Sequence, residues 1–493
     1  MSYKPSKYQS AIYAEYQSTS NNIFIKAGPG AGKSSVLLEI LKRTPFYKKS
    51  ILLAFNKSIA EELKSKVPAG VTVSTVHSMA YKTLLQNTSN KYKLQEIKTF
   101  ILAKKIIPDY FKDKKNGKKM MNVYLFTISR LYDLYRMNLA NKTEDDLREL
   151  GDEYNVDYSP KLITDTIKVI DYIEKYNNKS YTSKEMMIDF TDMLWLTYYL
   201  VNSSNFTLYD VVLCDEFQDV NPLQRELILK LIHKKGRFIF CGDEKQAIYS
   251  FMGSNLLSFN KLQEYPNTTV LPLSVCYRCG SNIIERANEI FPGMEAFEGN
   301  SEGIIRNGNL SEIKQGDMLL CRNNLPLVET FLNLLEIEKK SYIMGRDFGI
   351  ALCNLIDKVN HISDLDILLN QKIQNLKDRG IENPLNHKSY ISLSEKIMII
   401  KILINKKDFT LQEVSSLFKT LFKDNSNDNS ITLSTIHKAK GLEADRVFLL
   451  GYDSLLPSQY AQTELELRQE KCLQYVALTR AKKELIFISY TPN

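Results

Sequence analysis

The chain has 493 residues, 44% of them hydrophobic, and this length suggests roughly three domains with substantial cores. Its 65 basic and 57 acidic residues give a formal net charge of +8, which is mild for a nucleic-acid-binding protein unless the surplus lies along one groove. No run of about 18 apolar residues occurs, and the opening MSYKPSKYQS lacks the apolar core of a signal peptide. These features argue against a membrane protein or a membrane partner and predict a cytoplasmic, intracellular location.

Cysteine usage agrees with a reducing compartment. The seven cysteines are scattered, and several stand in apolar runs where a reduced thiol acts as a small hydrophobe. Cys276 and Cys279 form a CxxC pair, but a tetrahedral zinc site needs four ligands and no second pair lies nearby in the sequence. We predict neither zinc binding nor redox use for this pair.

The first two predicted elements flank a glycine-rich loop. Residues 7–16, KYQSAIYAEY, predict a helix in which the Gln9 amide, with its donor and its acceptor, could bind the edge of a base. Residues 22–35, NIFIKAGPGAGKSS, then join an apolar strand to a helix through three glycines. Such a loop binds polyphosphates, because its backbone N–H groups and the helix N-terminus face the ligand. Lys33 would reach the outer phosphates and Ser34 would bind Mg²⁺.

Two further strand-to-helix units follow, in residues 50–68 and 71–85. This alternation predicts a parallel sheet with ligands at the carboxyl ends of its strands. Phe55, Asn56 and His77 fall at those ends, where rings could stack on bases and the amide could hold a phosphate. Residues 85–189 then show helical periodicity and predict a helical insert, after which Trp195 lies in an apolar helix and is predicted to be core.

A second chemical centre is predicted where the apolar strand at 211–214 ends in Asp215 and Glu216. The first carboxylate can hold the Mg²⁺ shared with Ser34, and the second can orient and deprotonate the attacking water. Gln246 follows the next apolar strand and could sense the γ-phosphate, with the rings of Tyr249 and Phe251 directly after it.

Six stretches in order, AGPGAGKS, CDEFQD, GDEKQAIYSFMG, LSVCYR, STIHKAKGLE and YVALTRAKK, resemble the motifs of UvrD/Rep-like superfamily 1 DNA helicases. The resemblance extends from about residue 9 to residue 483. It implies ATP and Mg²⁺ as cofactors, single-stranded DNA and single/double-strand junctions as partners, and 3′-to-5′ translocation with duplex unwinding. The protein partners are not specified.

The resemblance carries roles to single residues. It assigns catalysis to Lys33, Asp215, Glu216, Gln246, Arg278 and Arg480, the last as an arginine finger. It assigns ATP binding to Gln9, Gly28, Gly30, Gly32, Lys33, Ser34, Ser35, Tyr277 and Glu443, and metal binding to Ser34 and Asp215. It assigns single-stranded DNA binding to Phe55, Asn56, His77, Tyr249, Phe251 and His437.

The fold that the resemblance implies is α/β, with two RecA-like parallel-sheet P-loop domains that each carry a mainly helical insert. Because the two arginines lie far along the chain from the phosphate loop, we expect ATP to close a cleft between these domains. The β-rich run at 268–273 is expected to open the second sheet. The expected boundaries are 1–84 and 190–258 for domain 1A, 85–189 for insert 1B, 259–346 and 428–493 for domain 2A, and 347–427 for a reduced insert 2B.

Three departures from the family pattern keep alternatives open. Phe251 and Met252 replace the usual tryptophan and arginine, the second insert is short, and the chain ends soon after the last motif, so no C-terminal partner-recruiting tail is expected. One alternative is a translocase that strips proteins from single strands without unwinding. The other, from a different class, is a nucleotide-gated clamp on single-stranded DNA.

Overall fold

The computed structural model describes residues 4–113, 117–154, 156–180, 185–202, 205–248, 259, 262–378, 381, 383–407, 409–424, 430–461 and 463–491. The chain divides into two compact units, Met1–Ser274 and Val275–Asn493. Within the described part, no helix is both long enough and apolar enough to cross a membrane.

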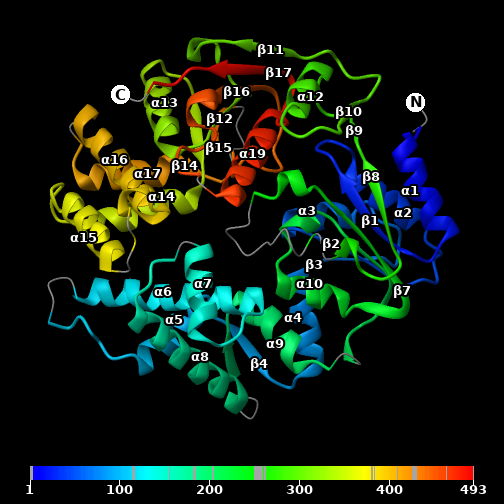
Figure 1. Ribbon diagram of the computed structural model, residues 1–493, viewed down its shortest axis with the longest axis horizontal. Helices are drawn as coiled ribbons and strands as arrows, with labels where there is room; N and C mark the ends of the chain where they lie inside the picture. The colour runs from blue at the N-terminus through cyan, green and yellow to red at the C-terminus, as the bar shows by residue number, and fades with distance from the viewer. Residues whose placement is uncertain are drawn as a thin grey trace. The chain divides into compact units, whose positions relative to one another are not determined.

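The first unit is built on a six-stranded sheet with the order β3-β2-β6-β7-β1-β8, and all its pairs are parallel (Figure 1). Its strands are β1 (Asn22–Ala27), β2 (Ser50–Ala54), β3 (Thr72–Thr75), β6 (Tyr209–Cys214), β7 (Ile232–Gly242) and β8 (Thr268–Leu273). The surrounding helices are α1 (Lys7–Ser18), α2 (Lys33–Arg43), α3 (Lys57–Lys64), α4 (Val76–Asn87), α9 (Phe190–Leu200) and α10 (Pro222–Leu229).

Strands of this sheet are buried on both faces, which is why they are almost continuously apolar. Ile23 and Leu52 pack in one hydrophobic cluster, whereas their neighbours Phe24 and Leu53 pack in another. Alternate residues of a strand point to opposite faces, so helices α1–α3 cover one face and α4, α9 and α10 the other. Trp195 of α9 is 6% exposed, which confirms its predicted place in the core.

The segment between α4 and α9 is mainly helical and contains α5 (Lys98–Ile106), α6 (Gly117–Asn138), α7 (Glu144–Glu153) and α8 (Pro160–Ser180). Figure 1 shows these four helices gathered side by side. A small parallel sheet of β4 (Lys91–Leu94) and β5 (Glu185–Ile188) joins the two ends of the segment, a pairing that the sequence did not predict.

The expectation that residues 268–273 open the second sheet is wrong. This run is β8, which pairs with β1 in the first sheet from Asn22↔Thr268 to Ala27↔Leu273. The boundary at 258/259 therefore places β8 in the wrong unit. The sequence shows a strand here but not its partner, because strand pairing is non-local. Pro272 is tolerated because β8 lies at the edge of the sheet, where a missing N–H leaves no ladder bond broken.

The second unit is built on a seven-stranded sheet with the order β11-β17-β16-β12-β15-β13-β14, again with parallel pairs. Its strands are β11 (Ile304–Asn307), β12 (Met318–Cys321), β13 (Ser341–Met344), β14 (Phe422–Lys423), β15 (Ile431–Thr435), β16 (Ala444–Leu450) and β17 (Ala481–Ile488). A separate pair joins β9 (Val275–Cys276) and β10 (Glu295–Ala296).

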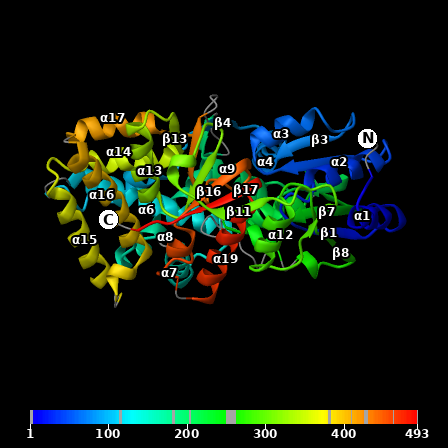
Figure 2. The ribbon, with the colours of Figure 1, turned by 90° about the horizontal axis from the view of Figure 1, so that it is seen from above.

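Helices of the second unit fall into two groups. Those that flank the sheet strands are α12 (Ser281–Asn288), α13 (Asn324–Glu336), α18 (Tyr452–Leu455) and α19 (Glu464–Leu478). Those between β13 and β14 are α14 (Arg346–Ile356), α15 (Asp364–Asp378), α16 (Lys388–Lys407) and α17 (Leu411–Leu421), and they group together in Figure 2. The predicted fold class, α/β with two parallel sheets consistent with RecA-like domains, is confirmed.

Candidate nucleotide-binding site

The carboxyl edge of the first sheet carries the predicted residues in an order set by the strands. Along the sheet, His77 follows β3, Phe55 follows β2, Asp215 follows β6, Gln246 follows β7 and the phosphate loop follows β1. The predicted phosphate-binding and metal-binding residues of the first unit therefore gather at β6, β7 and β1. The predicted DNA contacts Phe55 and His77 lie at the other end of the same edge.

The phosphate loop has the backbone that its glycines were predicted to allow. Gly30 and Gly32 have positive φ angles of 65° and 78°, a conformation that L side chains rarely adopt. Gly32 is the N-cap of α2, so Lys33, Ser34 and Ser35 occupy the first turn of that helix. Gln9 is 2% exposed, and its side-chain nitrogen would lie 3.6 Å from a Cβ atom added at Gly32. The structure thus places Gln9 beside the loop.

Two polar contacts join α2 to the end of β6. The Lys33 ammonium lies 2.7 Å from Glu216 Oε1, and the Ser34 hydroxyl donates to Asp215 Oδ2 at 2.7 Å. Burial opposes the charge of Lys33, but Glu216 and Asp215 outweigh it and raise the Lys33 pKa. Burial, and then the neighbouring Glu216 charge, raise the pKa of Asp215. The site is therefore a buried cluster in which the Lys33 cation favours the charged form of Asp215, against the effect of burial.

Glu216 is held in an unusual conformation. Its φ and ψ angles are 50° and 42°, in the left-handed region that few residues other than glycine occupy. The next residue, Phe217, is 1% exposed and stacks on Phe240 with ring centroids 4.5 Å apart. This buried ring anchors the backbone beyond Glu216, so the packing holds the strained residue in place.

A short hydrogen-bonded chain runs from Glu216 to Gln246. Gln218 donates from Nε2 to Glu216 Oε2 and accepts at Oε1 from the backbone N–H of Asp243, at 2.9 Å. Gln246 is 5% exposed and donates to Asp243 Oδ2 at 2.7 Å. A Cβ atom at Gly242 would lie 2.7 Å from Gln218 Oε1, so the approach of Gln218 requires glycine there.

The sequence analysis missed Gln218 and Asp243 as members of this chain. Both stand inside quoted motifs, CDEFQD and GDEKQAIYSFMG, so their positions were available. Their contacts could not be predicted, because β6 and β7 come together only in the folded sheet.

A divalent cation fits the oxygen donors at the α2–β6 junction. Ser34 Oγ and Asp215 Oδ2 lie 2.7 Å apart. Mg²⁺ prefers oxygen ligands, and in phosphate-binding sites it takes one or two from the protein and the others from water and phosphate. No group of three or more His, Cys, Asp or Glu side chains that could hold a metal occurs among the described residues.

The predicted DNA-binding residues of the first unit differ in their solvent exposure and in their hydrogen bonds. The Phe55 side chain is 49% exposed, whereas the Asn56 oxygen accepts from the backbone N–H of Ile59 at 2.9 Å and so caps α3. Burial lowers the pKa of His77, so its imidazole is neutral near pH 7. Tyr249 and Phe251, together with Met252, lie outside the described residues.

In the second unit, an ion pair joins the segment that carries Tyr277 and Arg278 to the segment that carries Glu443. The Arg278 guanidinium forms an ion pair with Glu443, and Glu443 also lies 2.7 Å from the Lys482 ammonium. Tyr277 is 36% exposed, and its ring lies 4.9 Å from that of Phe297. Lys482 is the member of this group that the sequence analysis missed.

The Arg480 side chain is buried, not at the surface. It is 1% exposed, and its guanidinium donates to the carbonyls of Val476 and Leu442, at 3.0 and 3.1 Å, and to the Thr479 hydroxyl at 3.1 Å. In this conformation Arg480 fixes the backbone just before Glu443. The role of Arg480 as an arginine finger stays a prediction.

His437 lies apart from Glu443 and Arg480 on the second sheet. It follows the carboxyl end of β15, whereas Glu443 and Arg480 directly precede the amino ends of β16 and β17. Burial, together with the Arg322 charge, lowers the pKa of His437 to about 3. Any contact of His437 with DNA would therefore be made by a neutral ring.

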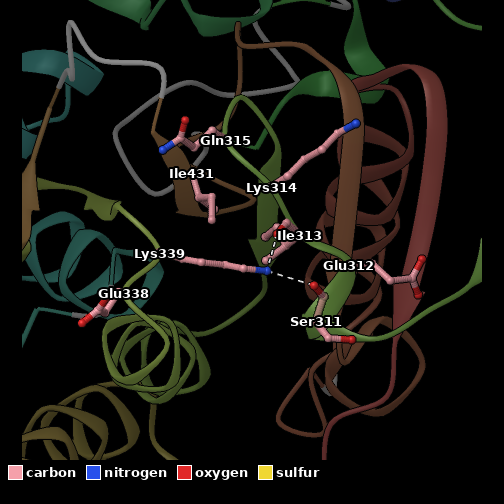
Figure 3. A pocket seen from close by; sticks show the side chains of 8 residues that line it. All are labelled: Ser311, Glu312, Ile313, Lys314, Gln315, Glu338, Lys339 and Ile431. Carbon is pink, nitrogen blue, oxygen red and sulfur yellow. Dashed lines mark hydrogen bonds between the residues drawn. The ribbon is translucent and has the colours of Figure 1, made fainter.

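A cavity of about 520 Å³ opens elsewhere on the second unit (Figure 3). Its lining residues, which include Lys314, Lys339 and Ile431, lie at the amino ends of β12, β13 and β15. Figure 3 shows Lys339 bonded to the carbonyls of Ser311 and Ile313, at 2.9 and 2.7 Å. The cavity contains none of the predicted site residues.

The CxxC cysteines support the segment that carries Tyr277 and Arg278. Cys276 and Cys279 are both buried and are not joined in a disulfide. Asn300 donates to the backbone carbonyls of both cysteines, at 2.7 and 2.8 Å. These two hydrogen bonds lie on either side of Tyr277 and Arg278 in the chain. The fold thus uses this pair in packing.

A glycine loop at a helix N-terminus, a lysine within it and an Asp-Glu pair at a neighbouring strand end together define a P-loop nucleoside triphosphatase. The family comparison is more specific. A family model described as the UvrD/REP helicase N-terminal domain matches residues 9–267, and one described as the UvrD-like helicase C-terminal domain matches residues 430–488. The first match alone spans more than half of the 493 residues, and the chain belongs to the UvrD/REP helicase family.

Curated relatives agree with this assignment. The F-box DNA helicase protein 1 of Schizosaccharomyces pombe is 25% identical over 94% of this chain and 55% of its own length. A probable DNA helicase II homolog of Mycoplasma genitalium is 25% identical over 94% of this chain and 82% of its own length. The ATP-dependent DNA helicase Rep of Buchnera aphidicola is 22% identical over 95% of this chain and 92% of its own length. The chain thus spans about half of the first relative and most of the other two.

Proposed function

We propose that this helicase is an ATP-driven motor that moves 3′ to 5′ along single-stranded DNA inside the cell and separates the duplex that it meets. Family membership and the names of the relatives support ATP-dependent action on DNA. The observation that carries the proposal is the Lys33–Glu216 ion pair beside the Ser34–Asp215 hydrogen bond.

The ion pair suggests how hydrolysis depends on bound nucleotide. The Lys33 ammonium forms an ion pair with Glu216, the carboxylate that would accept the proton of the attacking water. Transfer of this ammonium to the phosphates would free Glu216 to act as the base. Ser34 and Asp215 would hold Mg²⁺, which supplies charge neutralisation at the phosphates.

The remaining roles belong to the same proposal. Gln9, Tyr277 and Glu443 would contact the nucleoside, and Gln246 would sense the γ-phosphate through the chain that ends at Glu216. Arg278 and Arg480 would couple hydrolysis to movement by stabilising the transferred phosphoryl group. The proposed DNA contacts are Phe55, Asn56, His77, Tyr249, Phe251 and His437.

We also propose the division into domains 1A, 1B, 2A and 2B, with β8 moved to domain 1A. The helical segments α5–α8 and α14–α17 support the two inserts. A translocase that strips proteins without unwinding remains the second candidate, because insert 2B is short.

Strand displacement tests the proposal. Duplexes with a 3′ or a 5′ single-stranded tail are incubated with the protein, ATP and Mg²⁺, with Lys33→Ala as the inactive variant. Lys42→Ala is the matched control, because Lys42 lies on the same helix with a 62% exposed side chain.

Unwinding of the 3′-tailed duplex alone, lost in Lys33→Ala only, supports the helicase. If neither duplex opens while single strands still stimulate hydrolysis, the translocase replaces it. If single strands bind but do not stimulate hydrolysis, the protein is a clamp.

A further inference from the structure

Two exposed aromatic rings lie at the edge of the first sheet opposite the phosphate loop. Phe46 is 99% exposed and Tyr47 is 73% exposed, and their ring centroids are 5.9 Å apart in an edge-to-face arrangement. Both stand in the loop between α2 and β2, at the amino end of β2. The two neighbouring rings therefore gain little from burial, and their faces are open to solvent.

A lysine-rich bulge lies at the same edge. Ile232 pairs with Tyr209, yet Arg237 pairs with Val211, so residues 233–236 of β7 loop out opposite a single residue of β6. This residue, Asp210, exchanges backbone and side-chain hydrogen bonds with Lys49, at 2.8 and 2.9 Å. The bulge and the aromatic loop are therefore neighbours across β6.

The two segments together present a basic surface. We define the amino-edge patch as the exposed residues Phe46, Tyr47, Lys48, Lys49, His233, Lys234 and Lys235. It contains four lysines, and the one acidic side chain described between its two segments, Asp210, accepts from the Lys49 backbone. The Lys49 ammonium also lies 5.3 Å from the centre of the Tyr209 ring. The patch thus combines open π faces with positive charge.

We propose that the amino-edge patch is a second binding site for single-stranded nucleic acid, separate from the contacts at the carboxyl ends of β2 and β3. Stacking on open rings and neutralisation of phosphates by lysines are the two interactions that such strands use without regard to sequence. The choice of occupant rests on the proposed function, in which single-stranded DNA is the track. Five residues of β2 separate the two edges by about 17 Å, so one strand must be long to occupy both.

The aromatic pair distinguishes this occupant from a docked protein. An apolar protein surface would bind leucine side chains nearly as well as rings, whereas base stacking requires a π face. The test variants are therefore Phe46→Leu/Tyr47→Leu, which keeps apolar surface, and Phe46→Tyr/Tyr47→Phe, which keeps both rings. Because these side chains are exposed, the fold is expected to tolerate both changes, and thermal unfolding checks this.

Binding is measured by fluorescence anisotropy without ATP, on oligothymidylates of about 10 and about 40 nucleotides, since one compact site spans roughly 4–16 nucleotides. The leucine variant is expected to bind the longer strand about 10-fold more weakly and the shorter strand as the wild type does. The ring-exchanged variant is expected to bind both strands normally. Normal binding of the longer strand by the leucine variant would overturn the proposal.

Charge and position are tested separately. On the longer strand, the double variant Lys234→Ser/Lys235→Ser should make the negative slope of log K, the logarithm of the association constant, against log salt shallower by about 1.4. The double variant Lys234→Arg/Lys235→Arg should leave this slope unchanged. Hydrogen exchange of residues 44–50 and 232–237 should slow with the longer strand only. An unchanged slope, or exchange that stays fast, argues against binding here. Phe55→Ala should weaken the binding of both the longer and the shorter strand. It therefore tests the DNA contact of the proposed function independently of the amino-edge patch.

Discussion

At the scale of single residues, the carboxylate of Glu216 is controlled from three directions. Its backbone is held in the left-handed region, one oxygen faces the Lys33 ammonium, and the other accepts from Gln218. A general base must be within hydrogen-bond reach of its water and correctly oriented. In the proposed function Gln218 is therefore a positioning residue, since it bonds the Glu216 carboxylate and is itself bonded by the backbone N–H of Asp243.

Replacement of this amide gives the first prediction. Gln218→Ala should lower kcat for DNA-stimulated ATP hydrolysis by up to about 100-fold, because a misplacement of about 1 Å can cost that much. The KM for ATP should change little, since Gln218 does not belong to the phosphate loop. Steady-state kinetics measures both constants, with exposed Gln412→Ala as the control. A raised KM with unchanged kcat would contradict the positioning role.

The low pKa of His437 gives the second prediction. In the unfolded chain a histidine titrates near 6.5, so between pH 6.5 and about 3 the unfolded state binds a proton that the folded state does not. The free energy of unfolding therefore falls as the pH is lowered through this window. Between pH 7 and pH 5 this loss is at most about 2 kcal/mol, and His437→Gln should remove it. Urea unfolding at the two pH values measures it, and an equal pH dependence in both proteins would refute the assignment.

At the scale of elements, a buried ionic network joins α5, α6 and α9. Arg136 of α6 is fully buried and donates to Asp189 at 3.0 and 2.9 Å and to Asp192 at 2.7 Å. Lys98 of α5, also fully buried, donates to Asp192 at 2.7 Å and to Asn177 of α8 at 2.9 Å. Asp189 and Asp192 also form the capping box of α9. The network thus connects the helical segment to a helix that packs on the sheet.

Arg136→Met tests this connection. Removal of the guanidinium takes the ion-pair partner from buried Asp189 and leaves Asp192 with Lys98 alone, so the free energy of unfolding should fall by about 3–5 kcal/mol. Arg148→Met is the matched control, because the Arg148 side chain is 41% exposed and its ion pair with Glu144 should contribute less than about 1 kcal/mol. Denaturant unfolding measures the loss of unfolding free energy in both variants. Equal losses would mean that the buried network does not stabilise this unit.

At the scale of the whole molecule, the corrected place of β8 predicts where the chain can be divided. A fragment of residues 1–274 should unfold cooperatively, because it keeps the complete six-stranded sheet. A fragment of residues 1–258 exposes β1 as an edge strand next to the phosphate loop and should be less stable. Thermal unfolding of both fragments checks this, and equal midpoints would show that β8 adds nothing to the first unit.

The sequence predicted local chemistry well and non-local pairing poorly. The phosphate loop and the Asp215–Glu216 pair are strand-end patterns that a short stretch of chain defines completely, and the structure brings them together. The partner of β8 and the contacts of Gln218 depend on which strands become neighbours, and no short pattern encodes that. The burial of Arg480 was also not predictable, because a motif names a residue without giving its side-chain conformation.

The position of β8 also determines where the polypeptide leaves the first unit. Leu273 ends β8, and its carbonyl accepts a hydrogen bond of 2.9 Å from the N–H of Gly28, the first glycine of the phosphate loop. Ser274 is the last residue of the first unit, and Val275 is the first residue of the second. One hydrogen bond and one residue therefore separate the phosphate loop from the boundary of its unit, so a fragment that ends before β8 also loses a partner of the loop backbone.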